Sequence, residues 1–224
     1  MPSAFGTAMI DTINGLQQHF RMNMIGGISM PMNCADFLRC RNDEISLLGQ
    51  LNIPENGRVL DFGCGAGRHI SYIRQKCSNV QCIGIETCDL LRNHCANTIT
   101  APSAFYDSWN NVPDREFDLI LLMGNGLGVL GAELNAVQML TDLVNSLRPQ
   151  GQILIESGNP FGRGYYAADF TINYQNMQDG PFTWGYADQE WLSVTLSQLG
   201  CNTAFQPSNA PGNMFFFAIG RRCT

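Results

Sequence analysis

The sequence predicts an α/β protein in which helices cover both faces of a mostly parallel sheet. Short apolar runs at residues 59–62, 80–85, 117–123 and 152–157 have the length of buried strands. The segments between these runs are longer, and their apolar residues recur at the three-to-four-residue spacing of helices. Strands that alternate with helices in this way form a parallel sheet that is covered on both sides.

The length and composition of the chain favour one folded domain over residues 1–224. Hydrophobic residues make up 45% of the 224 positions and charged residues only 14%, which argues against a disordered chain. The formal net charge is -6, Lys76 is the only lysine, and the arginines are scattered. A protein that binds nucleic acid needs clustered basic residues to neutralise phosphates, so we expect no nucleic-acid partner.

Cysteine usage and the N-terminal sequence bear on the compartment and on metals. The nine cysteines are an odd number and include no C-x2-C pair, which indicates reduced thiols and no metal site. The N-terminus lacks the basic region of a signal peptide, and no apolar run approaches the roughly 18 residues that a membrane helix needs. We therefore expect a cytoplasmic protein that has no membrane partner.

The first two segments of the chain differ in their patterns. Residues 1–50 are expected to form a helical N-terminal lid, because 8–22 and 35–51 carry helical apolar periods on either side of a methionine-rich connector at 22–32. Residues 51–158 form the alternating core. Its predicted elements are strands at 59–62, 80–85, within 99–106, 117–123 and 152–157, and helices at 68–75, 87–97 and 132–147.

The last segment, residues 159–224, has a different composition. Residues 159–187 show no clean period and are rich in tyrosine and other aromatic residues, which predicts an aromatic loop. A helix is expected at 188–199, with an aspartate in the N-cap position. Two strands near 202–206 and 214–220 are expected to form a terminal β-hairpin with a long loop.

A glycine-rich turn follows the first core strand. The stretch Asp61-Phe-Gly63-Cys64-Gly65-Ala-Gly67 lies between that strand and the next helix. Glycines let a ligand approach the backbone because no Cβ intervenes, and the helix start supplies free N–H groups at its positive end. The turn therefore predicts a site for an anionic or zwitterionic ligand group, although a simple tight turn is the alternative.

Glu86 ends the second core strand, where an acidic side chain can accept hydrogen bonds from both hydroxyls of a ribose. With its GxGxG turn and this acid, the sequence resembles the class I S-adenosylmethionine-dependent methyltransferases. Residues 117–121 are similar to that family's fourth-strand motif, and residues 147–156 to its LxPGG turn and fifth strand. The resemblance covers residues 51–158 and implies a Rossmann-like, seven-stranded sheet with an antiparallel C-terminal strand.

The resemblance implies S-adenosyl-L-methionine as cofactor and S-adenosyl-L-homocysteine as product. Asp61 would lie close to the ammonium group of the cofactor, directly or through water, and Glu86 would hold the ribose. Asp107 would accept a hydrogen bond from the adenine amino group, with a solvated loop aspartate as the alternative. The implied cofactor-binding residues are Asp61, Gly63, Cys64, Gly65, Gly67, Glu86, Asp107, Ser108, Met123 and Gly124.

The resemblance also implies methyl transfer to O or N of an acceptor. His19 is a candidate catalytic base because the predicted lid helix would carry it over the acceptor, and Asn125 is a candidate because it follows the fourth core strand. The alternatives are a surface or packing histidine and a turn asparagine. His69 is a further candidate base, and Tyr165 and Tyr166 are candidates for acceptor binding.

Composition favours a small molecule or a short peptide as acceptor, held between the methionine-rich lid and the tyrosine-rich segment. A nucleic-acid methyltransferase is disfavoured, because no [DN]-P-P-[YFW] motif follows the fourth strand. The glycine spacing also disfavours a nicotinamide-dependent oxidoreductase. A non-catalytic, cofactor-binding partner protein would carry the same cofactor-binding residues and stays open beside the enzyme. We expect a monomer or a homodimer.

Overall fold

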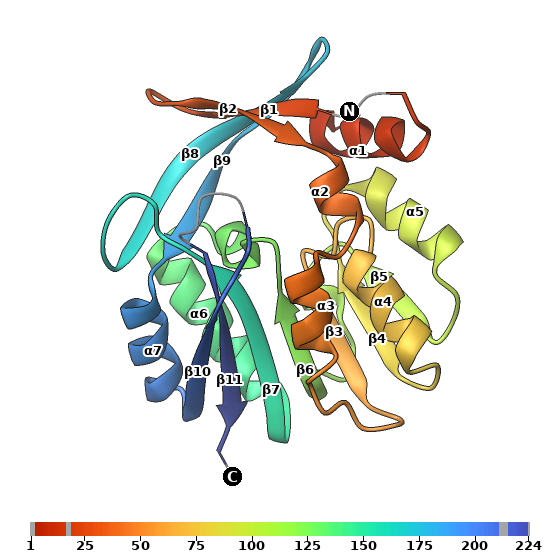
Figure 1. Ribbon diagram of the computed structural model, residues 1–224, viewed down its shortest axis with the longest axis vertical. Helices are drawn as coiled ribbons and strands as arrows, with labels where there is room; N and C mark the ends of the chain where they lie inside the picture. Colours follow the sequence, from red (N-terminus) through yellow and green to blue (C-terminus); the bar gives the residue numbers. More distant parts are fainter. Residues whose placement is uncertain (1–2, 17–18, 211–214, 224) are drawn as a thin grey trace.

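The computed structural model describes residues 3–16, 19–210 and 215–223, which form two β-sheets and the helices that pack on them (Figure 1). The larger sheet has seven strands in the order β10-β11-β7-β6-β3-β4-β5. They are β3 (Arg58–Phe62), β4 (Gln81–Ile85), β5 (Ser103–Tyr106), β6 (Phe117–Leu122), β7 (Leu147–Ser157), β10 (Cys201–Pro207) and β11 (Phe216–Arg222). The strands from β7 to β5 run parallel, and β11 is antiparallel to its two neighbours. The predicted seven-stranded, mostly parallel sheet is therefore confirmed.

Helices pack on both faces of this sheet. They are α3 (Asn42–Leu48), α4 (Arg68–Lys76), α5 (Asp89–Thr98), α6 (Glu133–Asn145) and α7 (Gln189–Gln198), with the short 3-10 helices η1 (Trp109–Asn111) and η2 (Gly126–Leu130). Successive residues of the central strands alternate between two apolar cores. Ile153 and Ile155 of β7 belong to the core that contains α6 and α7, whereas Leu154 belongs to the core of α3 and α4. The core strands are continuous apolar runs because both of their faces are buried.

A second, four-stranded antiparallel sheet arches over one end of the first (Figure 1). Its order is β2-β1-β8-β9, with β1 (His19–Met24), β2 (Ser29–Asn33), β8 (Tyr165–Tyr174) and β9 (Met177–Ala187). The sequence prediction was wrong here, because residues 159–187 contain two long strands and the methionine-rich connector belongs to a hairpin. Arg21 of β1 pairs with Asn173 of β8. No local pattern reveals a pairing between segments so far apart in the chain, since strand preference depends on cross-strand neighbours.

The N-terminal segment is only partly helical. Helix α1 (Ala4–Ile13) ends well before residue 22, and the predicted helix at 35–51 is divided into α2 (Ala35–Leu38) and α3. Arg39 has extended backbone and separates the two. The expected helical lid is therefore corrected to a lid of helices and a β-hairpin. Residues 17–18 of the predicted first helix and residues 211–214 of the predicted terminal hairpin lie outside the described part of the chain.

The lid, by which we mean α1, α2 and the four-stranded sheet, lies over the glycine-rich turn. Its apolar core, which joins α1, β1 and β8, also contacts Ala66 of the turn and Cys88 after β4. Gly6 of α1 approaches Cys88 so closely that a Cβ at Gly6 would collide with the sulfur. The Asp179 carboxylate of β9 accepts hydrogen bonds from the first two backbone N–H groups of α1, each at 2.8 Å. The lid is therefore packed and capped as one unit.

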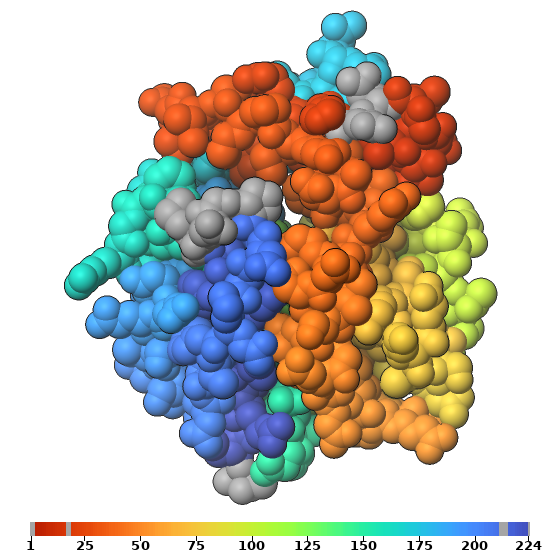
Figure 2. All heavy atoms as spheres, viewed as in Figure 1, coloured from red at the N-terminus to blue at the C-terminus, as the bar shows by residue number. Residues whose placement is uncertain are grey.

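The segment between the lid and the core runs down one side of the molecule. Figure 2 shows it in orange, between the C-terminal strands and α4. Asp43 of α3 accepts a hydrogen bond from the backbone N–H of Asn209 at 2.7 Å, which ties this segment to the loop after β10.

Three smaller expectations concern a helix cap, the cysteines and the membrane. Helix α7 begins as predicted, because Asp188 accepts a hydrogen bond from the backbone N–H of Trp191 at 2.8 Å. All nine cysteines lie in the described ranges, and all are free thiols. Within those ranges no helix is both long enough and apolar enough to pass through a membrane.

Candidate functional site

The carboxyl ends of β3, β4 and β5 meet at one edge of the large sheet, beneath the lid. Phe62 of β3 lies opposite Ile85 of β4, which in turn lies opposite Tyr106 of β5. The chain between Glu86 and Asp107 is short, yet β5 keeps the register of its neighbours. Glu86 and Asp107 therefore begin adjacent loops at the edge where open α/β sheets bind their ligands.

The three glycines of the turn have positive φ angles of 77°, 55° and 77° at Gly63, Gly65 and Gly67. Their surroundings differ. A Cβ on Gly65 would meet open space, whereas a Cβ on Gly67 would collide with Ile99 and lie 3.1 Å from Sγ of Cys95. Gly65 therefore leaves room for a ligand, and Gly67 allows α4 to pack closely against α5.

Glu86 is held against the glycine turn. Its carboxylate accepts hydrogen bonds from the backbone N–H groups of Gly65, at 2.9 Å, and Cys88, at 2.8 Å, and only 8% of the residue is exposed. Burial raises the pKa of the Glu86 carboxyl, while these two donors and Arg92 act in the opposite direction. Each carboxylate oxygen keeps a further acceptor position, which suits a pair of neighbouring hydroxyls.

Asp107 and Ser108 follow β5 at the outer end of this row. Asp107 is exposed, and the side chain of Asn111 donates a hydrogen bond to its Oδ1 at 2.6 Å, which lowers the pKa of the Asp107 carboxyl. Ser108 has extended backbone and immediately precedes η1. An ionised acceptor therefore begins the loop after β5, next to the loop that Glu86 begins after β4.

Asp61 lies near the end of β3 and is only 1% exposed. Its Oδ2 lies 3.5 Å from Nδ1 of His69 and has no hydrogen-bond partner of normal geometry in the described part of the chain. A buried carboxylate oxygen without a full hydrogen bond is costly. A cationic ligand group beside Asp61 would relieve that cost, so this residue fits the ammonium group of the expected cofactor.

His69 lies on α4 between two buried carboxylates. Its Nδ1 faces Asp61, and its Nε2 lies 3.5 Å from Oε1 of Glu44. Burial lowers the pKa of His69, but the Asp61 and Glu44 carboxylates on either side of the ring outweigh it, so the pKa is raised overall. A buried ring with a carboxylate on each nitrogen is not free to remove a proton from an acceptor, so we do not assign His69 as a base.

Sequence reasoning missed two buried glutamates, Glu44 of α3 and Glu156 of β7. Glu44 accepts hydrogen bonds from the side chain of Arg68 and from the backbone N–H of Arg41, both at 2.7 Å. Glu156 forms an ion pair with Arg41 and accepts a hydrogen bond from the backbone N–H of Gly124 at 2.7 Å. This buried ion network fixes the backbone that follows β6. Glu156 had one signal, a charge at the end of an apolar strand, because glutamate is rarely buried unpaired.

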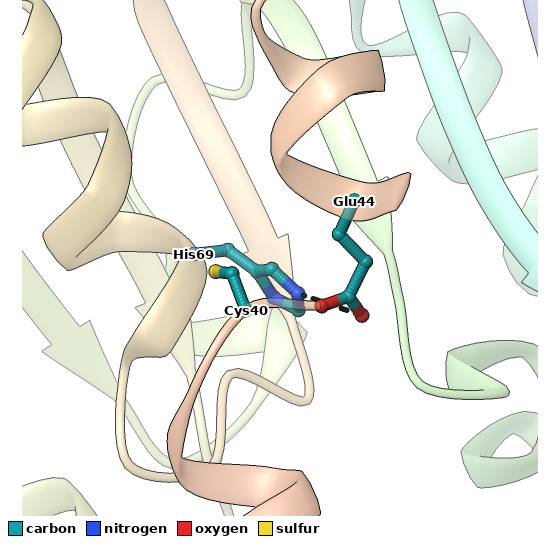
Figure 3. A group of neighbouring side chains, drawn as sticks. All are labelled: Cys40, Glu44 and His69. Atoms are coloured by element: carbon teal, nitrogen blue, oxygen red, sulfur yellow. Dashed lines mark hydrogen bonds and ion pairs between the residues drawn. The ribbon is translucent and has the colours of Figure 1, made fainter. Parts of the chain in front are cut away.

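Figure 3 shows that Cys40, from the α2–α3 connection, lies near Glu44 and His69. One ligand atom from each of the three lies within 4.8 Å of the others, a grouping that can hold a metal ion. The donors do not fit a metal, because the two oxygens of Glu44 already face the guanidinium groups of Arg41 and Arg68 and a backbone N–H. Burial and the Glu44 charge raise the pKa of the Cys40 thiol to about 12, so it is a neutral thiol. We assign these residues to the buried ion network.

The segment after β6 meets the lid. Met123 is buried, and Asn125 has a φ of 57° and a buried Oδ1 with no hydrogen-bond partner in the described ranges. Trp184 of β9 packs so closely on Gly128 of η2 that a Cβ on this glycine would collide with the indole. Between these contacts, Val129 is 42% exposed and would lie 3.6 Å from a Cβ built on Gly63. An apolar side chain therefore lies near the turn, and the segment after β6 also carries a buried amide oxygen without a hydrogen-bond partner in the described ranges.

The other residues predicted to act on the acceptor side, His19, Tyr165 and Tyr166, lie in the lid. Tyr165 donates a hydrogen bond to the carbonyl of Gly131 at 2.6 Å, and burial raises the pKa of its phenol to about 12. Tyr166 packs against Phe161, with ring centroids 4.5 Å apart. His19 is not on a helix as predicted but begins β1 with an exposed side chain. The Tyr165 hydroxyl thus connects β8 to the residue that follows η2, and His19 lies on the surface.

Comparison with known protein families decides the relationship. A family model described as a methyltransferase domain matches residues 35–193. The chain belongs to the methyltransferase domain family. The resemblance to class I S-adenosylmethionine-dependent methyltransferases is thereby confirmed, and S-adenosylmethionine is the cofactor of this family.

Solved methyltransferases share the fold. A SAM-dependent methyltransferase from Bacteroides fragilis, in complex with S-adenosyl-L-homocysteine, matches with a TM-score of 0.80 and 20% identity over 99% of this chain and 95% of that chain. DesVI from Streptomyces venezuelae has a TM-score of 0.59 and 15% identity over 81% of this chain and 91% of its own. The sugar N-methyltransferase KedS8 from Streptoalloteichus has a TM-score of 0.55 and 13% identity, with 76% and 82% covered. A search of curated proteins found no match.

Proposed function

We propose that this methyltransferase transfers the methyl group of S-adenosylmethionine to a nitrogen or oxygen atom of a small molecule or short peptide. The observation that carries the proposal is the row of groups at the carboxyl edge beneath the lid. A buried carboxylate at Asp61 whose Oδ2 lacks a full hydrogen bond, open space at Gly65 and a held carboxylate at Glu86 follow one another along that edge. Their order matches the ammonium, thioether and ribose parts of the cofactor.

The cofactor would lie across the ends of β3, β4 and β5. Asp61 would face its ammonium group, Glu86 would accept hydrogen bonds from the two ribose hydroxyls, and Asp107 would accept one from the adenine amino group. The remaining contacts would come from backbone atoms of Gly63, Cys64, Gly65, Gly67, Ser108, Met123 and Gly124.

The acceptor would lie between the lid and the segment after β6. The methyl carbon is already activated by the sulfonium charge, so the protein mainly aligns an acceptor lone pair and excludes water. The unpaired Oδ1 of Asn125 would accept a hydrogen bond from the acceptor and turn its lone pair toward the methyl group. His19 is exposed and His69 is held between carboxylates, so neither serves as a base in this proposal.

Nitrogen acceptors are the first class to test. A neutral amine already carries the lone pair for the displacement, whereas a hydroxyl also needs a base to remove its proton. Two structural neighbours are named as a sugar N-methyltransferase and as an amino pentose methyltransferase, CalS10 from Micromonospora echinaspora, which has a TM-score of 0.51 and 15% identity. Amino sugars therefore head the panel of acceptors.

The free thiols suit a reducing, cytoplasmic compartment. We propose that the protein is a monomer or a homodimer.

Two measurements test the proposal. S-adenosyl-L-homocysteine should raise the melting temperature, because a ligand that binds only the folded state stabilises it. A shift with NADH and none with S-adenosyl-L-homocysteine would instead favour a nicotinamide-dependent oxidoreductase. Transfer of a labelled methyl group to an amine panel tests turnover, and cofactor binding without any transfer would favour a non-catalytic partner protein.

A further inference from the structure

We propose that His69 is a positioning residue for the ammonium group of the cofactor, and that binding of this group beside Asp61 displaces a proton from the His69 ring. The inference rests on the proposed function, because it requires S-adenosylmethionine or its product to lie at Asp61. It goes further in giving a task to a buried histidine that touches neither the acceptor nor the methyl group.

The surroundings of His69 define the charges that act on it. Asp61 of β3 faces Nδ1 and Glu44 of α3 faces Nε2, each at 3.5 Å. Arg68 precedes His69 on α4 and binds Glu44 at 2.7 Å, so it opposes a positive charge on the ring. The neutral thiol of Cys40 lies on the α2–α3 connection within the same group. Two carboxylates therefore favour the imidazolium form, and one guanidinium disfavours it.

The buried ion network contains more acidic than basic groups. Its carboxylates are Asp43, Glu44, Asp61 and Glu156, and its guanidinium groups are Arg41 and Arg68. Four negative charges thus face two positive charges. Asp43, Glu44 and Glu156 each contact a guanidinium group, whereas within the described ranges Asp61 contacts none and its Oδ2 has no full hydrogen bond. In the cofactor-free protein, a protonated His69 places a positive charge beside Asp61.

Cofactor binding brings a second positive group to the same carboxylate. An ammonium group beside Asp61 repels the imidazolium and lowers the pKa of His69. The ring then gives one proton to the buffer and keeps the other, and no covalent bond to the cofactor changes. Because binding releases a proton, cofactor affinity must rise with pH over the range where His69 titrates, by up to about tenfold per pH unit.

The experiment is isothermal titration of S-adenosyl-L-homocysteine into the wild-type protein, from about pH 6 to about pH 8, around the ordinary histidine value of about 6.5. Two buffers of different ionisation enthalpy give the number of protons released. Wild type should release a fraction of one proton and bind more tightly as pH rises. His69→Asn keeps a neutral N–H donor near the Nδ1 position, so it should bind without this proton release and with a flatter pH profile.

Two controls separate His69 from other titrating groups. His94→Asn changes a histidine on α5 outside the network and should release as many protons as wild type. 5′-Methylthioadenosine keeps the ribose that Glu86 would hold but lacks the ammonium group, so its binding to wild type should release no His69 proton.

The outcomes are distinct. Equal proton release by wild type and His69→Asn, or equal release with 5′-methylthioadenosine, would overturn the inference and leave the proposed function intact. A complete lack of S-adenosyl-L-homocysteine binding at every pH would overturn both. If His69→Asn melts below the assay temperature, His69→Gln, which keeps a neutral amide toward Glu44, carries the same test.

Discussion

The glycine turn allows a test that separates cofactor binding from stability. Gly65→Ala places a methyl group in open space at a φ of 55°. The left-handed backbone costs a residue with Cβ about 1–2 kcal/mol. For a chain of this size, that cost corresponds to a fall in melting temperature of roughly 2–8 °C. The same methyl group occupies space that the cofactor would fill, and overpacking costs about 1–3 kcal/mol, which is roughly a 5- to 150-fold loss of affinity.

Gly67→Ala is the matched control, because Gly67 has the same backbone requirement and a different neighbourhood. Its Cβ would collide with Ile99 and crowd Cys95, so the backbone strain and the overpacking both destabilise the folded protein. We expect a loss of about 2–5 kcal/mol in urea unfolding, larger than that for Gly65→Ala. Titration calorimetry with S-adenosyl-L-homocysteine should show the larger affinity loss in Gly65→Ala. Wild-type affinity in Gly65→Ala would refute the placement of the cofactor on this turn.

Three further changes probe the lid and the network. Asp188→Ala removes the cap of α7 and the acceptor for the Gly164 N–H, and should lower the unfolding free energy in urea by about 1–2 kcal/mol, while Asp188→Asn should lose less. Tyr165→Phe removes the hydrogen bond to Gly131 and should lower the unfolding free energy in urea by about 0.5–1.5 kcal/mol, with methyl transfer retained. Loss of methyl transfer at unchanged stability would instead show that the hydroxyl acts on the acceptor. In the cofactor-free protein, the raised pKa of His69 contributes stability that is full below the unfolded value of about 6.5 and is lost as pH rises through the folded value. The unfolding free-energy difference between wild type and His69→Asn should therefore shrink with rising pH, and a difference that grows would contradict the charge assignment.

The core could be predicted from the sequence because its signals are local. Strand β3, the glycine turn, strand β4 and Glu86 all lie within residues 58–86, and the parallel order of the core strands follows from their alternation with helices. The lid could not be predicted in the same way. The spacing of apolar residues over 8–22 fits a helix, yet residues 19–22 belong to β1, which pairs with β8, and only the partner strand shows which form is taken.

The candidate site likewise contains some residues that local sequence patterns predict and others that they do not. Asp61, Glu86 and Asp107 could be placed because each follows or ends a strand that the sequence reveals. The pairing of His69 with Glu44 could not, since residues 44 and 69 lie on separate helices whose packing no linear pattern specifies. His19 was misplaced for a related reason, because its role depended on a helix that the chain does not form there.

The pairing of β1 with β8 has a consequence for how the protein is made. Arg21 and Asn173 are about 150 positions apart, which at a synthesis rate of about 5–20 residues per second corresponds to a delay of roughly 8–30 s. During that time β1 lacks its partner strand, and α1 lacks the Asp179 carboxylate that caps it. The parallel core emerges from the ribosome in between. Helix α1 and strand β1 are thus translated before the parallel core but reach their final places only after it, when β8 and β9 have been made.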